Sequence, residues 1–257
     1  MNLKNKNVYV IGGLGRIGLE VVRGLLDYSA NVILIDRQSP TSLIPSLKNN
    51  SNLSIFQIDS DEVEDAESVL LETINNIGCP DIFINCSYPR TKDWASNSFL
   101  DISLDSMRKN IDIHLNSYIW TAKLAADAMK ENNKTGSIIL TSSIYGLKAQ
   151  DQNLYKGTDL SENLTYGIIK AGVIQGSRQM ASYYGQFNIR VNTICPGGVQ
   201  DQNLQKNNFM ERYSIKTPLG RMASPKDLVG AYLFLSSDLS SYITGETLMV
   251  DGGFSIT

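Results

Sequence analysis

The stretch Val8-Tyr9-Val10-Ile11-Gly12-Gly13-Leu14-Gly15-Arg16-Ile17-Gly18 decides the fold. Its first four residues form an apolar run of strand length, and apolar side chains then recur at helical spacing from Leu19 to Leu26. Glycines between a strand and a helix let backbone amides approach a pyrophosphate, which then lies at the positive end of the helix. The stretch therefore predicts a dinucleotide-binding turn. A tight turn without a ligand would also use these glycines, so both interpretations stay open at this point.

The glycines fit two forms of the fingerprint. Gly13-x-Gly15-x-x-Gly18 fits the general form, and Gly12-x-x-Gly15-x-x-Gly18 fits a variant. From this turn we expect cofactor contacts by the following residues: Gly12, Gly15, Arg16, Ile17 and Gly18.

The next predicted strand, 31–35, ends at Asp36, 18 residues after Gly18. A carboxylate at this place accepts hydrogen bonds from both hydroxyls of the adenosine ribose and repels a 2′-phosphate. Asp36 therefore favours NAD over NADP. Arg37 beside it could bind that phosphate, which keeps NADP possible, or it could be an exposed loop charge.

Strands and helices alternate along the rest of the chain. Strands are predicted at 53–58, 81–85, 137–141, 188–194 and 247–250, and helices at 61–76, 100–132, 166–184 and 225–236. Residues 147–165 and 199–217 lack a period, so we expect loops there, the second a mobile segment over the site. This order predicts a single α/β domain over residues 1–257, built on a parallel sheet with right-handed crossovers.

The composition excludes several classes of function. A net charge of −3 and a pI near 5.3 argue against nucleic-acid binding. No apolar run approaches the ~20 residues of a membrane span, and no signal segment precedes the first strand, so we expect a cytoplasmic protein with a small-molecule substrate. One histidine and three scattered cysteines predict no metal site.

Tyr166 and Lys170 are four residues apart, so on a helix they lie on the same face. A positive charge ~4 Å from a phenol contributes about 4 kcal/mol at an effective dielectric of ~20, or roughly three pKa units. We therefore predict that Lys170 lowers the pKa of Tyr166 into the range of a general acid or base. A second pair at this spacing, Tyr88 and Lys92, contains Pro89 and lacks a helical pattern.

With these pieces in order, residues 5–254 resemble the short-chain dehydrogenase/reductase family. The resemblance rests on Tyr166-x-x-x-Lys170-Ala171 after Ser143, Ile189-Arg190-Val191-Asn192, Pro196-Gly197, Pro218-Leu219-Gly220-Arg221-Met222 and Asp251-Gly252-Gly253. It implies a Rossmann-like, doubly wound sheet of seven parallel strands, and a homotetramer or dimer.

The resemblance also implies roles for individual residues. Tyr166 would be the catalytic acid or base, Lys170 would hold the nicotinamide ribose, and Ser143 would bind the substrate oxygen. The remaining cofactor contacts would be Asp59 at the adenine, Asn85, Cys86 and Ser87 along the cofactor, and Pro196, Gly197 and Val199 at the nicotinamide.

The chain departs from the family pattern in four places. Arg16 replaces a glycine and Ile11 a threonine, and Cys86-Ser87-Tyr88 replaces Asn-Ala-Gly. His114 lies where the family has a catalytic asparagine; it could hold the same proton-relay water or be a packed core histidine. The segment between Ser143 and Tyr166 is longer than usual.

This insert is similar to that of a subgroup of oxidoreductases found with flagellin modification and nonulosonic-sugar biosynthesis, in Tyr145-Gly146 and Tyr155-Lys156-Gly157-Thr158. The leading hypothesis is an NAD(P)-dependent alcohol/ketone oxidoreductase acting on a sugar-like substrate. The alternatives are a 3-oxoacyl carrier-protein reductase that uses NADPH, and a dinucleotide-binding regulatory protein that has lost catalysis.

Overall fold

One parallel sheet runs through the computed structural model, which describes residues 2–38, 47, 50–58, 62–158, 160–201 and 207–257. The strands are β1 (Asn7–Ile11), β2 (Asn31–Asp36), β3 (Leu53–Gln57), β4 (Ile82–Asn85), β5 (Gly136–Thr141), β6 (Ile189–Pro196) and β7 (Thr247–Val250). They pair in the order β3-β2-β1-β4-β5-β6-β7. The predicted Rossmann-like sheet of seven parallel strands in a single α/β domain is confirmed.

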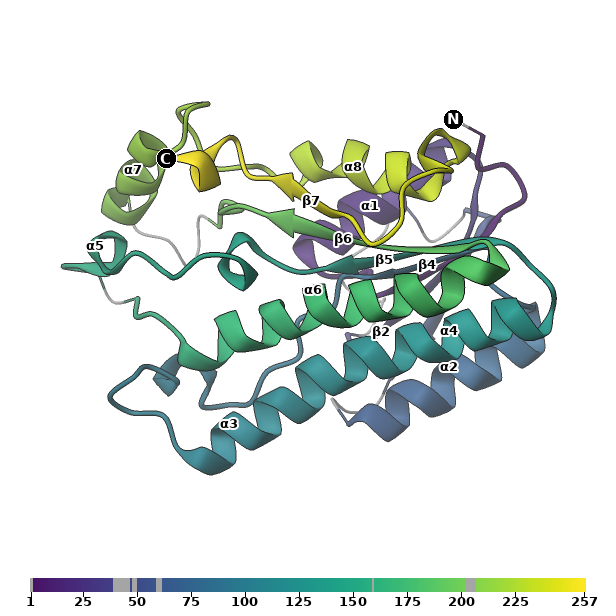
Figure 1. Cartoon of the computed structure of the whole chain (residues 1–257), viewed down its shortest axis with the longest axis horizontal. Coiled ribbons are helices and arrows are strands. Elements are labelled where there is room, and N and C mark those ends of the chain that lie inside the picture. The colour runs from purple at the N-terminus through teal and green to yellow at the C-terminus, as the bar shows by residue number, and fades with distance from the viewer. Residues whose placement is uncertain (1, 39–46, 48–49, 59–61, 159, 202–206) are drawn as a thin grey trace.

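Helices cover both faces of the sheet (Figure 1). On one face lie α1 (Arg16–Asp27) and α8 (Lys226–Ser236); on the other lie α2 (Val63–Ile77), α4 (Ser117–Glu131) and α6 (Leu164–Tyr184). Successive side chains of a strand point to opposite faces. In β1, Val8 and Val10 therefore enter the core under α1 and α8, whereas Tyr9 and Ile11 enter the core under α2, α4 and α6.

The predicted helical region 100–132 is three segments joined end to end. Helix α3 (Leu104–Asn110) passes into a π-helical turn, Ile111–Asn116, and then into α4. The Ser117 hydroxyl donates to the carbonyl of Ile113 at 2.6 Å. The π-helical turn places His114 in the interior, with no exposed surface.

Two segments predicted as loops contain helices. Helix α5 (Gln152–Tyr155) lies in the insert, and α7 (Asn207–Lys216) lies in the segment after β6, of which residues 202–206 fall outside the described residues. Both helices lie at the end of the sheet where the strands terminate (Figure 1).

These two helices form a roof over that end of the sheet. The roof has a hydrophobic cluster of its own, made by Ile144, Leu154, Phe209, Tyr213, Met222 and Phe254. The prediction of a loop at 199–217 was wrong because Phe209 and Tyr213 are an isolated apolar pair at i and i+4. Their helix depends on contacts with distant segments rather than on a long apolar stripe.

Among the described helices, none has both the length and the apolar character needed to cross a bilayer.

We predict that Gly18→Ala destabilises the protein by about 2–3 kcal/mol, because a Cβ there would overlap the Gly12 carbonyl oxygen. Gly230→Ala is the matched control: a Cβ added there would meet nothing within 4 Å, so alanine should stabilise α8 by about 0.5–1 kcal/mol. Urea denaturation of both variants measures the difference. Equal stability of the two variants would show that the turn tolerates a side chain.

Candidate active site

A cavity of about 670 Å³ opens where the strands end, and most of the predicted site residues line it. These residues are Gly12, Gly15, Arg16, Ile17, Asp36, Arg37, Asn85, Cys86, Ser87, Ser143, Tyr166, Lys170, Pro196, Gly197 and Val199. Gly18 and His114 lie outside the lining, Gly18 packed on the Gly12 carbonyl and His114 against Lys170. Asp59 lies outside the described residues.

The glycine turn fits a dinucleotide. Gly12 has a φ of +75° and approaches the Ser87 backbone so closely that a Cβ would collide with it. The N-cap of α1 is Gly15, which offers no side-chain cap, and the first turn of α1 contains no acidic residue. The amides at the positive end of this helix are therefore not neutralised by the protein's own side chains, as binding of a pyrophosphate requires.

Asp36 ends β2 at the rim of the same cavity and is 8% exposed. Its carboxylate accepts hydrogen bonds from the amides of Leu14 at 2.8 Å and Gln38 at 2.9 Å. Each carboxylate oxygen has a second lone pair, so the group is oriented by the backbone and can still accept from ribose hydroxyls.

Arg16 reaches across the cavity to the segment that follows β6. Its guanidinium pairs with Asp201 at 3.1 Å and donates to the Gln200 carbonyl at 2.8 Å. The arginine that replaces a family glycine thus joins the cofactor turn to the opposite wall. Its contact with a phosphate stays a prediction.

Tyr166 and Ser143 both line the cavity. Tyr166 lies in the first turn of α6, and Ser143 follows the end of β5. The Asn163 side chain caps α6 by accepting from the Tyr166 amide at 2.9 Å, which fixes the phenol in the first turn of the helix. Ser143 follows β5 and caps a short 3-10 turn by accepting from the Tyr145 amide at 3.2 Å. Burial raises the pKa of Tyr166 to about 12, and a hydrogen bond with the Ser143 side chain lowers it in part.

The Lys170 amine is buried, with the residue 2% exposed. Its Nζ donates to the Thr141 carbonyl at 3.1 Å and contacts His114 Nε2 at 3.1 Å. It lies 4.9 Å from the centre of the Tyr118 ring and 5.8 Å from that of Tyr166. Burial lowers the pKa of Lys170 to about 7.

The prediction that Lys170 lowers the pKa of Tyr166 is wrong in this structure. The amine directs its hydrogen bonds to Thr141 and His114, and the pKa of Tyr166 is governed by burial. The shared helical face was predicted correctly, but the desolvation of both groups exceeds their mutual effect.

His114 contacts the lysine itself. Burial, and then the charge of Lys170, hold the pKa of His114 well below its usual value, so the ring is neutral, and Nε2 and the amine share a hydrogen bond. The other ring nitrogen, Nδ1, has no hydrogen-bond partner in the described part of the chain. The imidazole thus fixes the amine directly, a geometry that neither hypothesis from the sequence contained.

Sequence reasoning missed part of the wall. Tyr88, noted in the sequence only as part of the segment that replaces Asn-Ala-Gly, lines the cavity beside Arg90, and Trp94 packs edge-on against both Tyr88 and Tyr166. All three follow β4, and the loops at the carboxyl ends of parallel strands line the ligand crevice. That position was the available signal for Arg90 and Trp94.

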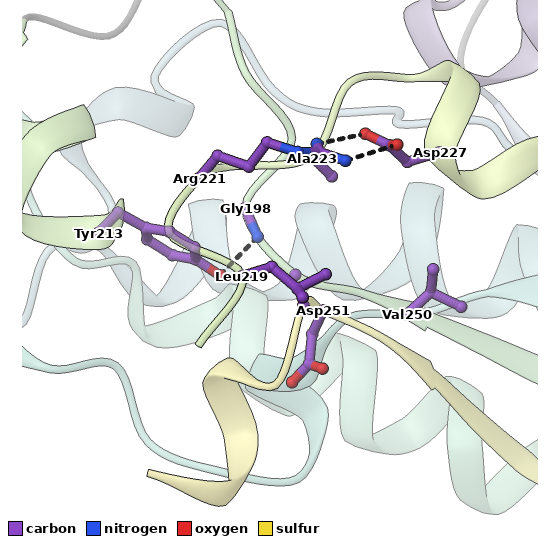
Figure 2. A pocket seen from close by; sticks show the side chains of 10 residues that line it. Gly198, Tyr213, Leu219, Arg221, Ala223, Asp227, Val250 and Asp251 are labelled. Atoms are coloured by element: carbon purple, nitrogen blue, oxygen red, sulfur yellow. Dashed lines mark hydrogen bonds and ion pairs between the residues drawn. The ribbon is translucent and has the colours of Figure 1, made fainter. Parts of the chain in front are cut away.

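A second cavity of about 200 Å³ adjoins the first and shares Gly197, Gly198 and Tyr213 with it (Figure 2). The Tyr213 hydroxyl accepts from the Gly198 amide at 2.5 Å, and Arg221 pairs with Asp227 through two contacts of 2.6 and 2.9 Å. These contacts brace the segment after β6 against α7 and α8. Over the described residues, no three His, Cys, Asp or Glu side chains gather where they could bind a metal.

We predict a pH-dependent gain in stability that depends on Lys170. Its pKa is about 7 when folded against an ordinary 10.5, so unfolding takes up a proton between these values and the free energy of unfolding rises with pH. From pH 7 to pH 9, the free energy of unfolding of the wild type should rise by about 1–2 kcal/mol more than that of Lys170→Met. Urea denaturation at pH 7, 8 and 9 measures this, with exposed Lys226→Met as the control. A pH-independent difference between Lys170→Met and wild type would contradict the assignment.

Comparison with known proteins gives the same picture over the whole chain. A family model described as enoyl-(acyl carrier protein) reductase matches residues 15–255. The post-translational flagellin modification protein A of Campylobacter coli is 30% identical over 258 residues, which cover 99% of this chain and 100% of that protein. The L-rhamnose 1-dehydrogenase (NAD(P)(+)) of Azotobacter vinelandii is 28% identical, with 98% of each chain covered.

A solved structure shares the architecture as well. The short-chain dehydrogenase of Leptospira borgpetersenii, with bound NAD⁺, superposes with a TM-score of 0.87 at 33% identity, covering 99% of this chain and 94% of that one. The similarity therefore extends over nearly the whole chain. The chain therefore belongs to the short-chain dehydrogenase/reductase family, as an oxidoreductase that acts on CH–OH groups with NAD(P).

Proposed function

We propose that the protein is an NAD(H)-dependent dehydrogenase or reductase of a hydroxylated, sugar-like substrate. The observation that carries the proposal is a single cavity that holds Tyr166, Ser143 and Lys170 together with the glycine turn and Asp36. In this arrangement a proton-transfer group faces a dinucleotide cleft.

The residues present fit the cofactor. The glycine turn would hold the pyrophosphate, Asp36 the adenosine ribose, and Lys170 the nicotinamide ribose; the nicotinamide would border Pro196, Gly197 and Val199. When bound, the nicotinamide supplies the donor or acceptor for hydride.

The protein's own residues transfer the proton to and from the substrate oxygen. With a pKa raised to about 12, the Tyr166 phenol is protonated at neutral pH and donates to a carbonyl oxygen as a general acid. Ser143, which lines the same cavity and whose side chain lowers the pKa of this phenol in part, orients the same oxygen. His114 is a positioning residue: it holds Lys170 at the end of β5, where the amine approaches Tyr166.

Two observations support a sugar-like substrate. The cavity wall near Tyr166 combines aromatic faces with hydroxyl groups, through Tyr88, Tyr145 and Tyr213. Pockets that pair apolar faces with a few polar groups suit a molecule that has both C–H faces and hydroxyls. The Azotobacter relative is named for a sugar, and the Campylobacter relative for flagellin modification, the context of the subgroup that the insert resembles.

An acyl thioester is the second candidate, because the matching family model is described as a reductase of acyl carrier protein substrates. The net charge of −3 offers no attraction to an acidic carrier. Assays with NAD and NADP against polyols, sugars and 3-hydroxyacyl thioesters distinguish the two. If the protein turned over thioesters and neither sugars nor polyols, an acyl thioester would replace the sugar-like molecule as the proposed substrate.

We predict that Tyr166→Phe lowers kcat by about 10²–10⁴-fold, because the variant has no proton to exchange with the substrate oxygen. NADH binding should stay within about threefold of wild type, since the ring keeps its packing. Steady-state assays and fluorescence titration measure the two effects. Tyr183→Phe, on the exposed face of the same helix, is the control. Undiminished turnover by Tyr166→Phe would refute the role of the phenol.

We also predict that NADH binds at least about tenfold more tightly than NADPH, because Asp36 repels a 2′-phosphate. Asp36→Asn should narrow this ratio, since it removes the charge and keeps a hydrogen-bond acceptor. Fluorescence titration with both cofactors gives the four dissociation constants. Equal affinities of the wild type for NADH and NADPH would contradict the role of Asp36. If Arg37→Gln lost affinity for NADPH and kept its affinity for NADH, the 2′-phosphate would bind at Arg37.

A further inference from the structure

The segment that follows β4, residues 88–97, is held rigidly against two helices. Thr91 is bonded twice to the Asn110 side chain in α3, its amide donating at 3.0 Å and its hydroxyl accepting at 2.8 Å. At the other end, the Asn163 side chain donates to the Trp94 carbonyl at 3.0 Å, next to the start of α6. This segment is therefore a preformed wall for whatever lies at Tyr166.

Aromatic contacts connect the wall to the catalytic phenol. The Tyr88 ring packs edge-on at 5.7 Å from Trp94 and 5.9 Å from Tyr166, measured between ring centres. The Arg90 guanidinium carbon lies 5.5 Å from the centre of the Tyr88 ring, within the range of a cation–π contact. Arg90 thus lines the same cavity as Tyr166, and the Tyr88 ring contacts both of them.

Several charged groups of the cavity wall are held by other parts of the protein. Arg16 pairs with Asp201, Glu62 pairs with Lys109, Asp36 accepts from two backbone amides, and Lys170 donates to Thr141 and contacts His114. Arg90 forms no ion pair with any residue that the structure describes. The cavity wall beside Tyr88 therefore carries a guanidinium that can bind an anion without first breaking an ion pair among the described residues.

We propose that Arg90 binds an anionic group, a carboxylate or a phosphate, on the hydroxylated substrate whose reacting CH–OH lies at Tyr166. The inference rests on the proposed function and names the substrate class more closely: a sugar acid, or the phosphate of a sugar or polyol, of monosaccharide length. The Tyr88 ring beneath the guanidinium holds it in place, so its planar edge can bind both oxygens of such a group.

The test compares three probes on the complex of the protein with NADH. Isothermal titration measures the binding of D-sorbitol, D-gluconate and D-sorbitol 6-phosphate to the wild type, to Arg90→Gln and to Arg90→Lys. We expect at least one anion to bind the wild type about tenfold or more tightly than sorbitol. Arg90→Gln should abolish this preference and leave sorbitol within about twofold. Arg90→Lys should retain part of it, because lysine keeps the charge and loses the planar fork.

The outcomes separate the possible ligands. A preference for gluconate alone identifies a carboxylate, and a preference for the phosphate alone identifies a phosphate. Arg108→Gln, an exposed arginine of α3 outside the cavity, should bind all three probes as the wild type does. Equal or weaker binding of both anions to the wild type, or a preference that survives in Arg90→Gln, overturns the proposal.

Because the measurement is of binding, it is independent of turnover. Anion binding through Arg90 without oxidation of any alcohol would contradict the proposed function and leave this site in place. Turnover of neutral sugars only, together with loss of anion preference, would contradict this site and leave the proposed function in place.

Discussion

A buried amine constrains this site more than any other group. Lys170 is almost without solvent, so its amine depends on partners in the protein, and each of its two hydrogen bonds fixes a different element. The Thr141 carbonyl fixes the end of β5, and His114 fixes the π-helical turn between α3 and α4. Tyr166 lies one turn earlier on α6, so the phenol is placed by the same helix that has to deliver the amine. The geometry of the candidate site and the hydrogen bonding of a buried amine therefore depend on the same contacts.

Most of the fold could be predicted from local patterns. The alternation of Val8 and Val10 with Tyr9 and Ile11, the glycine turn and the apolar spacing of α1 each act within a few residues, and all of them agree with the sheet that forms. The Tyr166 and Lys170 pair was also accessible, because helical spacing alone puts both side chains on one face. The sequence has no such pattern for α7. Its Phe209 and Tyr213 pack instead against distant side chains, Leu154 in the insert and Phe254 near the C-terminus.

The chemistry of the site was harder to predict, because contacts between distant segments set it. The raised pKa of Tyr166 results from burial by many residues, whereas the charge at i+4 was the only effect visible in the sequence. Arg16 meets the carbonyl of Gln200, 184 residues further along the chain, and no motif marks that pair. The imidazole of His114 could be placed near the site by resemblance, but its direct contact with the amine depends on the π-helical turn.

The roof over the strand ends has a wider consequence. Its cluster of Leu154, Phe209, Met222 and their neighbours is separate from the two cores that support the sheet. Four of its residues, Ile144, Phe209, Tyr213 and Met222, also line the large cavity. A substitution at one of them therefore alters the shape of the cavity and the packing of α7 together, whereas the two cores that support the sheet keep their own side chains.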